Sequence, residues 1–226
     1  MNILINDVAQ KGTNFTGNSS NVITTELKKL FTGTSFSFNI PASDVNCVGL
    51  ANTDATSITV QVVEGTNIYN KTFTINDNVA LYYFDAKYAN IDTVSVTLNS
   101  GTYLGKLAIG EYRNIKIYKS KEPEYISNVE NIEAPDGSLY EQTGGITKRV
   151  INCEFKAKIR EDQYSDYENL KTKIPKKMPF FIHFIDEAST FYGITYFYAK
   201  DDNPIVFQGS FNRMIYSKKY RFVECF

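Results

Sequence analysis

Few side chains in this sequence could carry out acid–base chemistry. His183 is the only histidine, and carboxylates stand next to each other at Glu161-Asp162 and Asp201-Asp202. Proton transfer needs such groups beside a nucleophile or a second titratable group. His183 lies in the apolar run Phe180–Ile185 with no serine or cysteine motif to activate, so we interpret it as a structural residue of a strand. Asp201-Asp202 is followed by Asn-Pro and has the composition of a turn.

The wider motif search also predicts no catalytic, metal-binding or cofactor-binding residue. The chain contains none of the P-loop, GxGxxG, GxSxG, HExxH or EF-hand patterns. Its three cysteines, Cys47, Cys153 and Cys225, are odd in number and far apart, which disfavours a zinc site or a disulfide framework. We therefore expect free thiols, synthesis in a reducing cytosol and no enzyme activity. Carboxylates of a glycosidase meet only in space, so a glycan-active enzyme stays open as a third alternative.

Binding chemistry is better represented than catalysis. Exposed Tyr, Asn and Asp side chains on the loops of a β-sandwich would suit a sugar. The tyrosines available for this are Tyr69, Tyr82, Tyr83, Tyr88 and Tyr103. We expect at least half of them to serve in core or cross-strand packing, and we assign no carbohydrate-binding residue.

Charge and hydropathy exclude several classes of partner. The net charge is −1, whereas phosphate binding needs a surplus of Lys and Arg, so nucleic acid is not expected. No run approaches the roughly 18 apolar residues of a membrane helix, and the first ten residues lack the features of a secretory signal. We therefore expect neither membrane insertion nor a signal-directed export route.

The charge distribution predicts two domains. The first 110 residues hold only six of the 24 Lys and Arg and eight of the 25 Asp and Glu, and they are rich in Asn, Thr and Ser. The remainder is heavily charged in both signs. This difference in the content of charged residues indicates two different surfaces. We place them in domains of residues 1–119 and 120–226.

The first domain is predicted to be a β-sandwich or jelly roll. Strands are expected at intervals of about ten residues with no helical period between them, which is typical of such folds. Pro41 should end the first strand, and the slip in alternation at Asp92-Thr93 suggests a bulge. The expected strands are Thr34–Ile40, Val45–Leu50, Ser57–Val63, Asn70–Ile75, Val79–Phe84, Ile91–Leu98 and Tyr103–Ile109.

The second domain is predicted to be mostly β with one helix. Alternation is strict over Lys148–Ile159, where one set of side chains is apolar throughout. Apolar residues then recur every three or four positions, which predicts a helix near residues 161–174 that Pro175 ends. Further strands are expected at Phe180–Phe184, Thr190–Tyr198, Ile205–Gln208 and Lys219–Cys225.

Short motifs in this order resemble a known class of proteins. Val94–Leu98 and Tyr103–Gly110 resemble the closing strands of galactose-binding-like jelly rolls in bacteriophage virion proteins. The second half resembles the split-barrel hub domain of phage distal tail proteins through Ser138–Gly145, Val150–Ile159, Pro179–Ile182 and Arg221–Glu224. The order departs from that family, because the hub domain usually comes first. The resemblance implies an all-β fold with minor α content: an N-terminal jelly roll and a C-terminal split β-barrel containing one helix.

The resemblance also implies a function. The chain would be a structural virion protein that forms a ring in a phage tail, at the tip, hub, distal tail or neck, with the jelly roll directed outward. It would be made in the host cytoplasm and would contact other copies of itself and other tail proteins. The alternative is a carbohydrate-binding adhesin that recognises a glycan on the host surface. Both roles are compatible in one protein.

Overall fold

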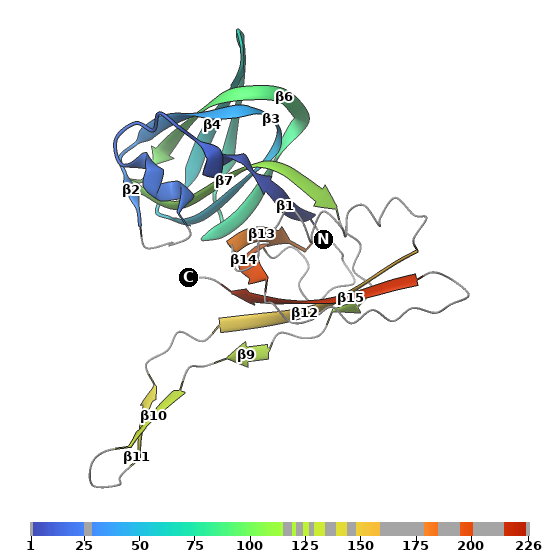
Figure 1. The fold of residues 1–226 in the computed structure, drawn as a ribbon. Helices are drawn as coiled ribbons and strands as arrows, with labels where there is room; N and C mark the ends of the chain where they lie inside the picture. The colour runs from blue at the N-terminus through green and yellow to red at the C-terminus, as the bar shows by residue number, and fades with distance from the viewer. Residues whose placement is uncertain are drawn as a thin grey trace.

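The computed structural model describes residues 2–24, 29–114, 119–120, 124–126, 129–133, 139–143, 148–158, 179–184, 195–200 and 215–224 (Figure 1). Almost all described elements are antiparallel strands, which confirms the all-β prediction. The described helical segments are the 3-10 turns η1 (Val8–Lys11) and η2 (Ser19–Ile23), and neither is long or apolar enough to cross a membrane. The strands of the N-terminal half are β1 (Asn2–Asp7), β2 (Phe31–Thr32), β3 (Ser35–Thr53), β4 (Ser57–Glu64), β5 (Asn67–Thr74), β6 (Val79–Ser100) and β7 (Tyr103–Asn114).

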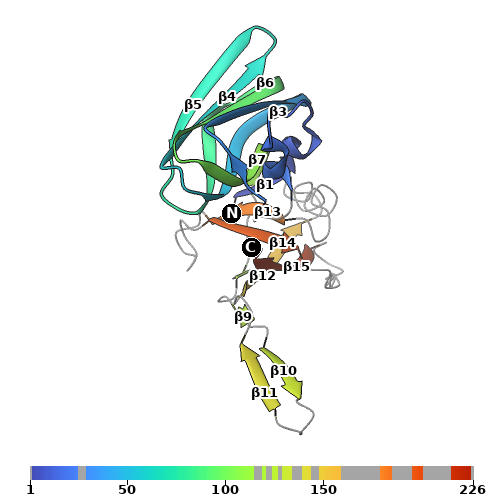
Figure 2. The same ribbon diagram turned by 90° about the vertical axis from the view of Figure 1, so that its left-hand side faces the viewer.

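One long bent pair of strands organises the N-terminal half. β3 and β6 pair from Ser35↔Thr97 at one end to Ala51↔Val79 at the other, with register shifts between Asn39 and Cys47. β4 and β5 extend the sheet beside the later half of β6, whereas β7 and β1 extend it beside the later half of β3. The bent pair therefore belongs to both layers, and the two layers form a β-sandwich (Figures 1 and 2).

Two sequence expectations about strand limits were wrong. Pro41 does not end a strand, because β3 continues through it, and Val79–Phe84 and Ile91–Leu98 are parts of the single strand β6. The ladder has no regular pairing between Asn39 and Ser43. A proline is tolerated at such a bulge because no ladder hydrogen bond is required from it.

The core lies between the two layers. Alternating residues of β3, β4 and β6 point inward, and Ile58, Val60, Val94 and Val96 are fully buried. Aromatic rings from both layers join the same cluster, including Phe38, which stacks on Phe15 with ring centroids 4.9 Å apart. The strict apolar–polar alternation in the sequence thus specifies which face of each strand is buried.

A second apolar cluster forms on the outside of the β3–β7 layer. Small residues of β3 and β7 leave a shallow surface there, and the buried ring of Phe181 from β13 (Pro179–His183) packs onto it. A methyl group placed on Gly49 would lie only 2.4 Å from Phe181 Cδ2. β13 also pairs with β1 at Ile3↔Ile182, so the sheet continues beyond residue 119. The division into domains at residues 119 and 120 stays a prediction.

The C-terminal half contributes the other strands of the sheet. β14 (Thr195–Lys200) and β15 (Ile215–Glu224) continue the sheet from β13, and β12 (Lys148–Lys158) follows them, as the sequence predicted for residues 148–159. The short strands β8 (Lys119–Ser120) and β9 (Glu124–Ile126) both pair with β12. The helix predicted near residues 161–174 and both acidic pairs lie outside the described residues, and the split barrel stays a prediction.

One hairpin stands apart from the 13-stranded sheet. β10 (Val129–Glu133) and β11 (Leu139–Thr143) pair with each other as a two-stranded sheet. Both views show this hairpin extending away from the rest of the protein (Figures 1 and 2). Two-stranded hairpins are only marginally stable in water on their own.

Candidate functional site: an uncharged face of the sandwich

The solvent-facing side of the sheet formed by the start of β3 (residues 35–39), the end of β6 (residues 93–99), β4 and β5 carries no charged residue. The inward residues of these strands form the core, so the alternate residues face outward. We call this set the uncharged face; it comprises Ser35, Ser37, Asn39, Ser57, Thr59, Gln61, Val63, Ile68, Asn70, Thr72, Thr74, Thr93, Ser95, Thr97 and Asn99. A protein surface ordinarily consists of about a quarter to a third Lys, Arg, Glu and Asp, so the absence of all four here is a distinctive property.

The strand register arranges these side chains in rows that cross the sheet. Two of the rows contain only hydroxyl and amide side chains, and the third ends in the pair Val63↔Ile68. From β3 to β5, the rows are Ser35–Thr97–Thr59–Thr72, Ser37–Ser95–Gln61–Asn70 and Asn39–Thr93–Val63–Ile68. The face is therefore a regular array rather than a scatter of polar residues.

Hydrogen bonds between neighbouring strands hold several of these side chains in place. The hydroxyls of Thr59 and Thr72 lie 2.8 Å apart, and Gln61 Nε2 donates to Asn70 Oδ1 at 2.9 Å. Asn99 Nδ2 lies 3.1 Å from Thr59 Oγ1 and 3.2 Å from Ser57 Oγ. Side chains fixed in this way lose little conformational entropy when they bind a ligand.

The edges of the uncharged face differ from each other. Residues 13–16 cover the outer edge of β3, where Thr13 bridges to Asn39 and Thr16 N donates to Ser37 O at 3.2 Å. β5 is the last strand at the opposite end of the described sheet. Ile68, which is 58% exposed, lies on β5 near the β4–β5 turn and is the only exposed large hydrophobic residue among those whose burial is described.

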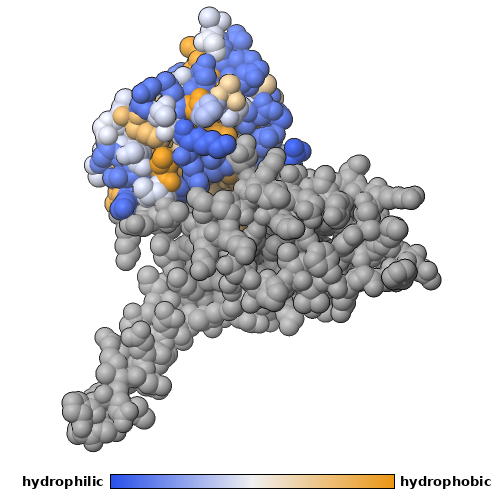
Figure 3. Space-filling model, in the orientation of Figure 1, coloured by the Kyte–Doolittle hydropathy of each residue, from blue (hydrophilic) through white to orange (hydrophobic). Residues whose placement is uncertain are grey.

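In Figure 3, the side of the sandwich turned to the viewer is mostly hydrophilic or neutral, with small separate hydrophobic areas.

This arrangement suits a neutral ligand with many hydroxyl groups. Serine and threonine hydroxyls and the amides of Asn and Gln both donate and accept hydrogen bonds. A charged ligand would gain no ion pair here, and its desolvation would be uncompensated. A charge-free array therefore favours a neutral polar surface or polymer over an anion or a cation.

The tyrosines proposed for sugar binding serve mainly in packing. Tyr69 stacks on Tyr88 with ring centroids 4.3 Å apart, and Tyr82 stacks on Phe73 at 5.1 Å. Tyr83 lies 4.8 Å from the Tyr112 ring in an edge-to-face contact. The expectation that at least half would serve in core or cross-strand packing is confirmed, because Tyr69, Tyr82 and Tyr88 pack against the core. Tyr103 is half-buried at the start of β7, where its carbonyl accepts a hydrogen bond from Thr53 Oγ1 at 2.7 Å.

His183 is a structural residue at the junction of β13 with the sandwich. Its Nδ1 lies 2.7 Å from the hydroxyl of Tyr83, and the two rings stack with centroids 5.9 Å apart. Its neighbours Phe181, Ile182 and Phe184 are fully buried. Burial lowers the pKa of His183 below 6.5, which favours a neutral ring whose Nδ1 accepts the tyrosine hydrogen.

This lowered pKa predicts a pH effect on stability. The unfolded chain binds a proton more readily than the folded one, so acidification from about pH 7 to about pH 5 should destabilise the protein through His183. We expect the melting temperature of the wild type to fall more steeply over this range than that of His183→Gln. Thermal unfolding of both proteins at several pH values measures the difference, and parallel slopes would contradict the assignment.

Several described carboxylates also have structural partners. Lys87 bridges Asp44 and Glu111 at 2.6 and 2.7 Å, and Lys71 pairs with Asp85. No group of three or more His, Cys, Asp or Glu residues that could hold a metal occurs within the described ranges. Of the cysteines, Cys47 is a buried free thiol whose Sγ lies 3.4 Å from Gly110 O, while the side chains of the other two are not described.

Asp54 closes the turn before β7. One carboxylate oxygen accepts hydrogen bonds from Thr102 N at 2.8 Å and Tyr103 N at 2.9 Å, and the other accepts from Thr102 Oγ1 at 3.0 Å. Burial raises the pKa of Asp54, but these hydrogen bonds outweigh it and lower the pKa overall. Gly101 adopts φ +117° beside it, so the turn between β6 and β7 lies at Gly101-Thr102 and is held by a carboxylate.

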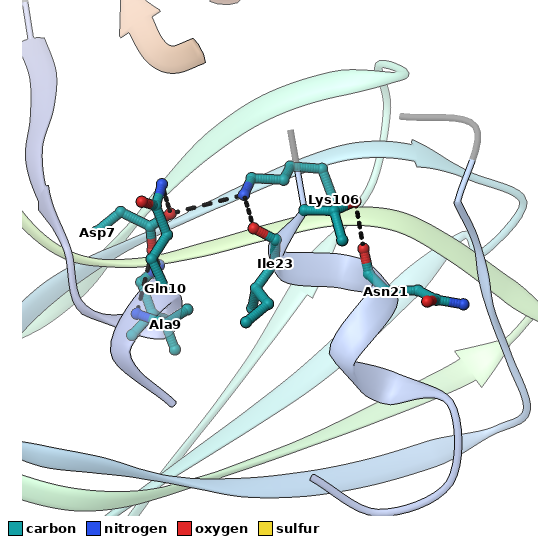
Figure 4. A network of polar contacts seen from close by, with 8 residues as sticks. Asp7, Ala9, Gln10, Asn21, Ile23 and Lys106 are labelled. Carbon is teal, nitrogen blue, oxygen red and sulfur yellow. Dashed lines mark hydrogen bonds and ion pairs between the residues drawn. The ribbon is translucent and has the colours of Figure 1, made fainter. Parts of the chain in front are cut away.

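A buried ion pair lies at one end of the sandwich (Figure 4). Lys106 Nζ is 3.7 Å from Asp7 Oδ2 and donates to Ile23 O at 3.1 Å, and the lysine is only 1% exposed. Asp7 also accepts from Gln10 Nε2 at 3.1 Å, and its other oxygen accepts from Ala9 N and Ile109 N at 3.2 Å. The network ties η1 and η2 to β7. Burial raises the pKa of Asp7 and lowers that of Lys106, and their mutual attraction opposes both shifts.

Comparisons with known proteins do not identify the chain. No protein-family model matches it, and no curated protein matches it. Among solved structures, it is similar to an F5/8 type C domain from Bacteroides fragilis, with a TM-score of 0.36 and 10% identity over 42% of this chain and 80% of that one. It is also similar to the CBM32 module CpGH89CBM32-6 produced by Clostridium perfringens, with a TM-score of 0.39 and 12% identity over 46% of this chain and 98% of that one.

These similarities are slight. Both structures are galactose-binding-like jelly rolls, which is the kind of domain that the N-terminal motifs resemble. Neither structure is a bacteriophage protein or a split-barrel hub. TM-scores this low carry no argument about ligands or detailed topology. The functional argument therefore depends on the uncharged face itself.

Isolated aromatic and acidic residues on loops do not predict this face, because it comprises outward residues of four strands. The signal was present in the alternation, because Ser35-Phe36-Ser37-Phe38-Asn39 and Ser57–Val63 place uncharged polar residues at nearly every outward position. The register that brings these positions into rows comes only from the structure.

Proposed function

We propose that the protein is a non-catalytic recognition protein that binds a neutral glycan on the uncharged face. The observation that carries this proposal is the charge-free array of hydroxyl and amide side chains, which is already ordered by cross-strand hydrogen bonds. Val63 and Ile68 add an apolar margin that can contact the C–H groups of a sugar ring. The jelly-roll assignment of the N-terminal half belongs to the same proposal.

A glycan array probed with the full-length chain tests this function. We expect binding to neutral glycans that changes little with salt, because no ion pair contributes. Ser95→Lys places a charge and a long side chain at the centre of the face and should abolish the signal. Asn78→Ala, which changes an exposed loop residue outside the face, is the matched control and should bind as the wild type does.

Several outcomes would contradict this proposal. They are the absence of any glycan signal, a signal confined to sulfated or sialylated glycans, or binding that Ser95→Lys leaves unchanged. Melting temperatures of the variants establish that each one is folded before its binding is compared.

A second candidate is a ring-forming structural role in a phage tail. The observation in its favour is the β10–β11 hairpin, because a projecting two-stranded sheet gains stability when it packs against another surface. A neighbouring copy of the chain would supply that surface. The tail location, the ring and the contacts with other virion proteins all belong to this proposal.

Mass photometry over a range of concentrations tests ring formation. We expect closed oligomers from the full-length chain and monomers from a variant in which a short Gly-Ser linker replaces residues 129–143. A wild-type chain that stays monomeric at high concentration would contradict the ring. Glycan binding can survive that result, because the uncharged face lies on the sandwich and not on the hairpin.

A further inference from the structure

The geometry of the uncharged face also indicates the shape of its ligand. The face is the exposed side of a sheet rather than a pocket that would enclose a terminal sugar. Neighbouring strands lie about 4.8 Å apart, and a row of four strands therefore spans about 14 Å. An extended polymer is the form of ligand that can contact a whole row at once.

The chemistry of the face favours one direction for such a polymer. Across the strands, all four positions of each polar row are uncharged and polar: one row has four hydroxyls, Ser35–Thr97–Thr59–Thr72, and the other has two hydroxyls followed by two amides, Ser37–Ser95–Gln61–Asn70. Along β4 and β5, by contrast, the outward side chains change from polar to apolar within a few residues, at Val63 and Ile68. A polymer of identical units matches the repeat that crosses the strands.

The edges of the face are compatible with this direction. β3 is bordered by residues 13–16, which occupy its outer edge through Thr13 and Thr16. At the other end, β5 terminates the described sheet. A chain lying across the strands can continue past β5, so the site does not require a chain end there.

We propose that the uncharged face binds a linear neutral polysaccharide that crosses β3, β6, β4 and β5, with about one sugar unit over each strand. The polymer lies along the central row, Ser37–Ser95–Gln61–Asn70, with the hydroxyl row Ser35–Thr97–Thr59–Thr72 on one side of it and the apolar Val63–Ile68 pair on the other. This inference rests on the proposed glycan-binding function and adds the ligand's form, its direction and its minimum length.

Isothermal titration calorimetry with linear oligosaccharides tests the inference. The probes are neutral gluco-, xylo-, manno- and N-acetylglucosamine oligomers of increasing length, titrated into the full-length chain. In the series that binds, we expect affinity to rise several-fold with each added unit up to about four units and then to level off, because only four strands contribute contacts.

Variants at the ends of a row and at the ends of a strand separate the two possible directions. Ser37→Ala and Asn70→Ala lie at opposite ends of one row, and each should weaken binding of the four-unit oligomer by roughly two- to tenfold. Ser57→Ala, which lies on the face but outside the three rows, should weaken binding less than either row-end variant does. Asn78→Ala serves again as the control outside the face.

The outcomes distinguish the inference from the function on which it rests. If single sugars or disaccharides bind as tightly as longer oligomers, or if Ser57→Ala weakens binding while the row-end variants do not, the inference is overturned. The glycan-binding function survives both results as long as Ser95→Lys abolishes binding. If no neutral glycan binds at all, both fail.

Discussion

Lys106→Met should lower the free energy of unfolding by about 3 kcal/mol or more, because it leaves Asp7 as a buried charge without its counter-ion. The substitution keeps much of the side-chain volume, so packing changes little, but it also removes the hydrogen bond to Ile23 O. Urea unfolding followed by circular dichroism measures the loss. Lys71→Met is the matched control: its partner Asp85 has an 80% exposed side chain, and removal of such a pair should cost less than about 1 kcal/mol.

A double-mutant cycle assigns the effect to the pair. Asp7→Asn retains an oxygen that can accept from Ala9 N and Ile109 N, but it leaves Lys106 charged in the core. We expect the double variant Asp7→Asn/Lys106→Met to be less destabilised than the sum of the two single variants, since neither charge is then left unpaired. Additive losses would show that Asp7 and Lys106 do not act as a pair.

Gly49→Val should be the most disruptive substitution on the outer side of the β3–β7 layer. Any Cβ at this position would lie 2.4 to 2.7 Å from three atoms of the Phe181 ring. Overpacking of this kind costs about 1–3 kcal/mol or more, and here it acts directly on the packing of β13 against the sandwich. We expect a lower melting temperature together with faster proteolysis within the C-terminal half.

The partner substitution tests the cause of this effect. Phe181→Ala alone should destabilise the protein by about 3–5 kcal/mol, because a large buried ring is lost. In that background, Gly49→Val meets no ring, so its additional cost should largely disappear. An equal cost for Gly49→Val with and without Phe181 would mean that the strain arises elsewhere.

The sequence predicted which side of each strand is buried better than it predicted where each strand begins and ends. Alternation in Ser57–Val63 and in residues 94–98 identified the buried residues correctly, because burial of one face follows directly from a period of two. It could not predict that β3 passes through Pro41, because an irregular ladder there depends on the partner strand β6.

The candidate site was harder to predict for the same reason. Tyrosines and acidic pairs were evident as residue types, but Tyr69 and Tyr82 are used in ring stacking inside the protein. The rows of the uncharged face join residues as distant as Ser37 and Ser95 through register alone. The sequence around each residue does not indicate which residue of a distant strand lies opposite it.

The place of β1 in the sheet has a consequence for synthesis on the ribosome. β1 pairs with β7 on one side and β13 on the other, so its second edge stays open until residue 183 has emerged. Until then, the small-residue surface around Gly49 also lacks its covering ring. A nascent chain with an open strand edge and an uncovered apolar surface is prone to aggregate. Translation of the C-terminal half therefore protects the sandwich that precedes it, and a fragment ending at residue 119 would be made without that protection.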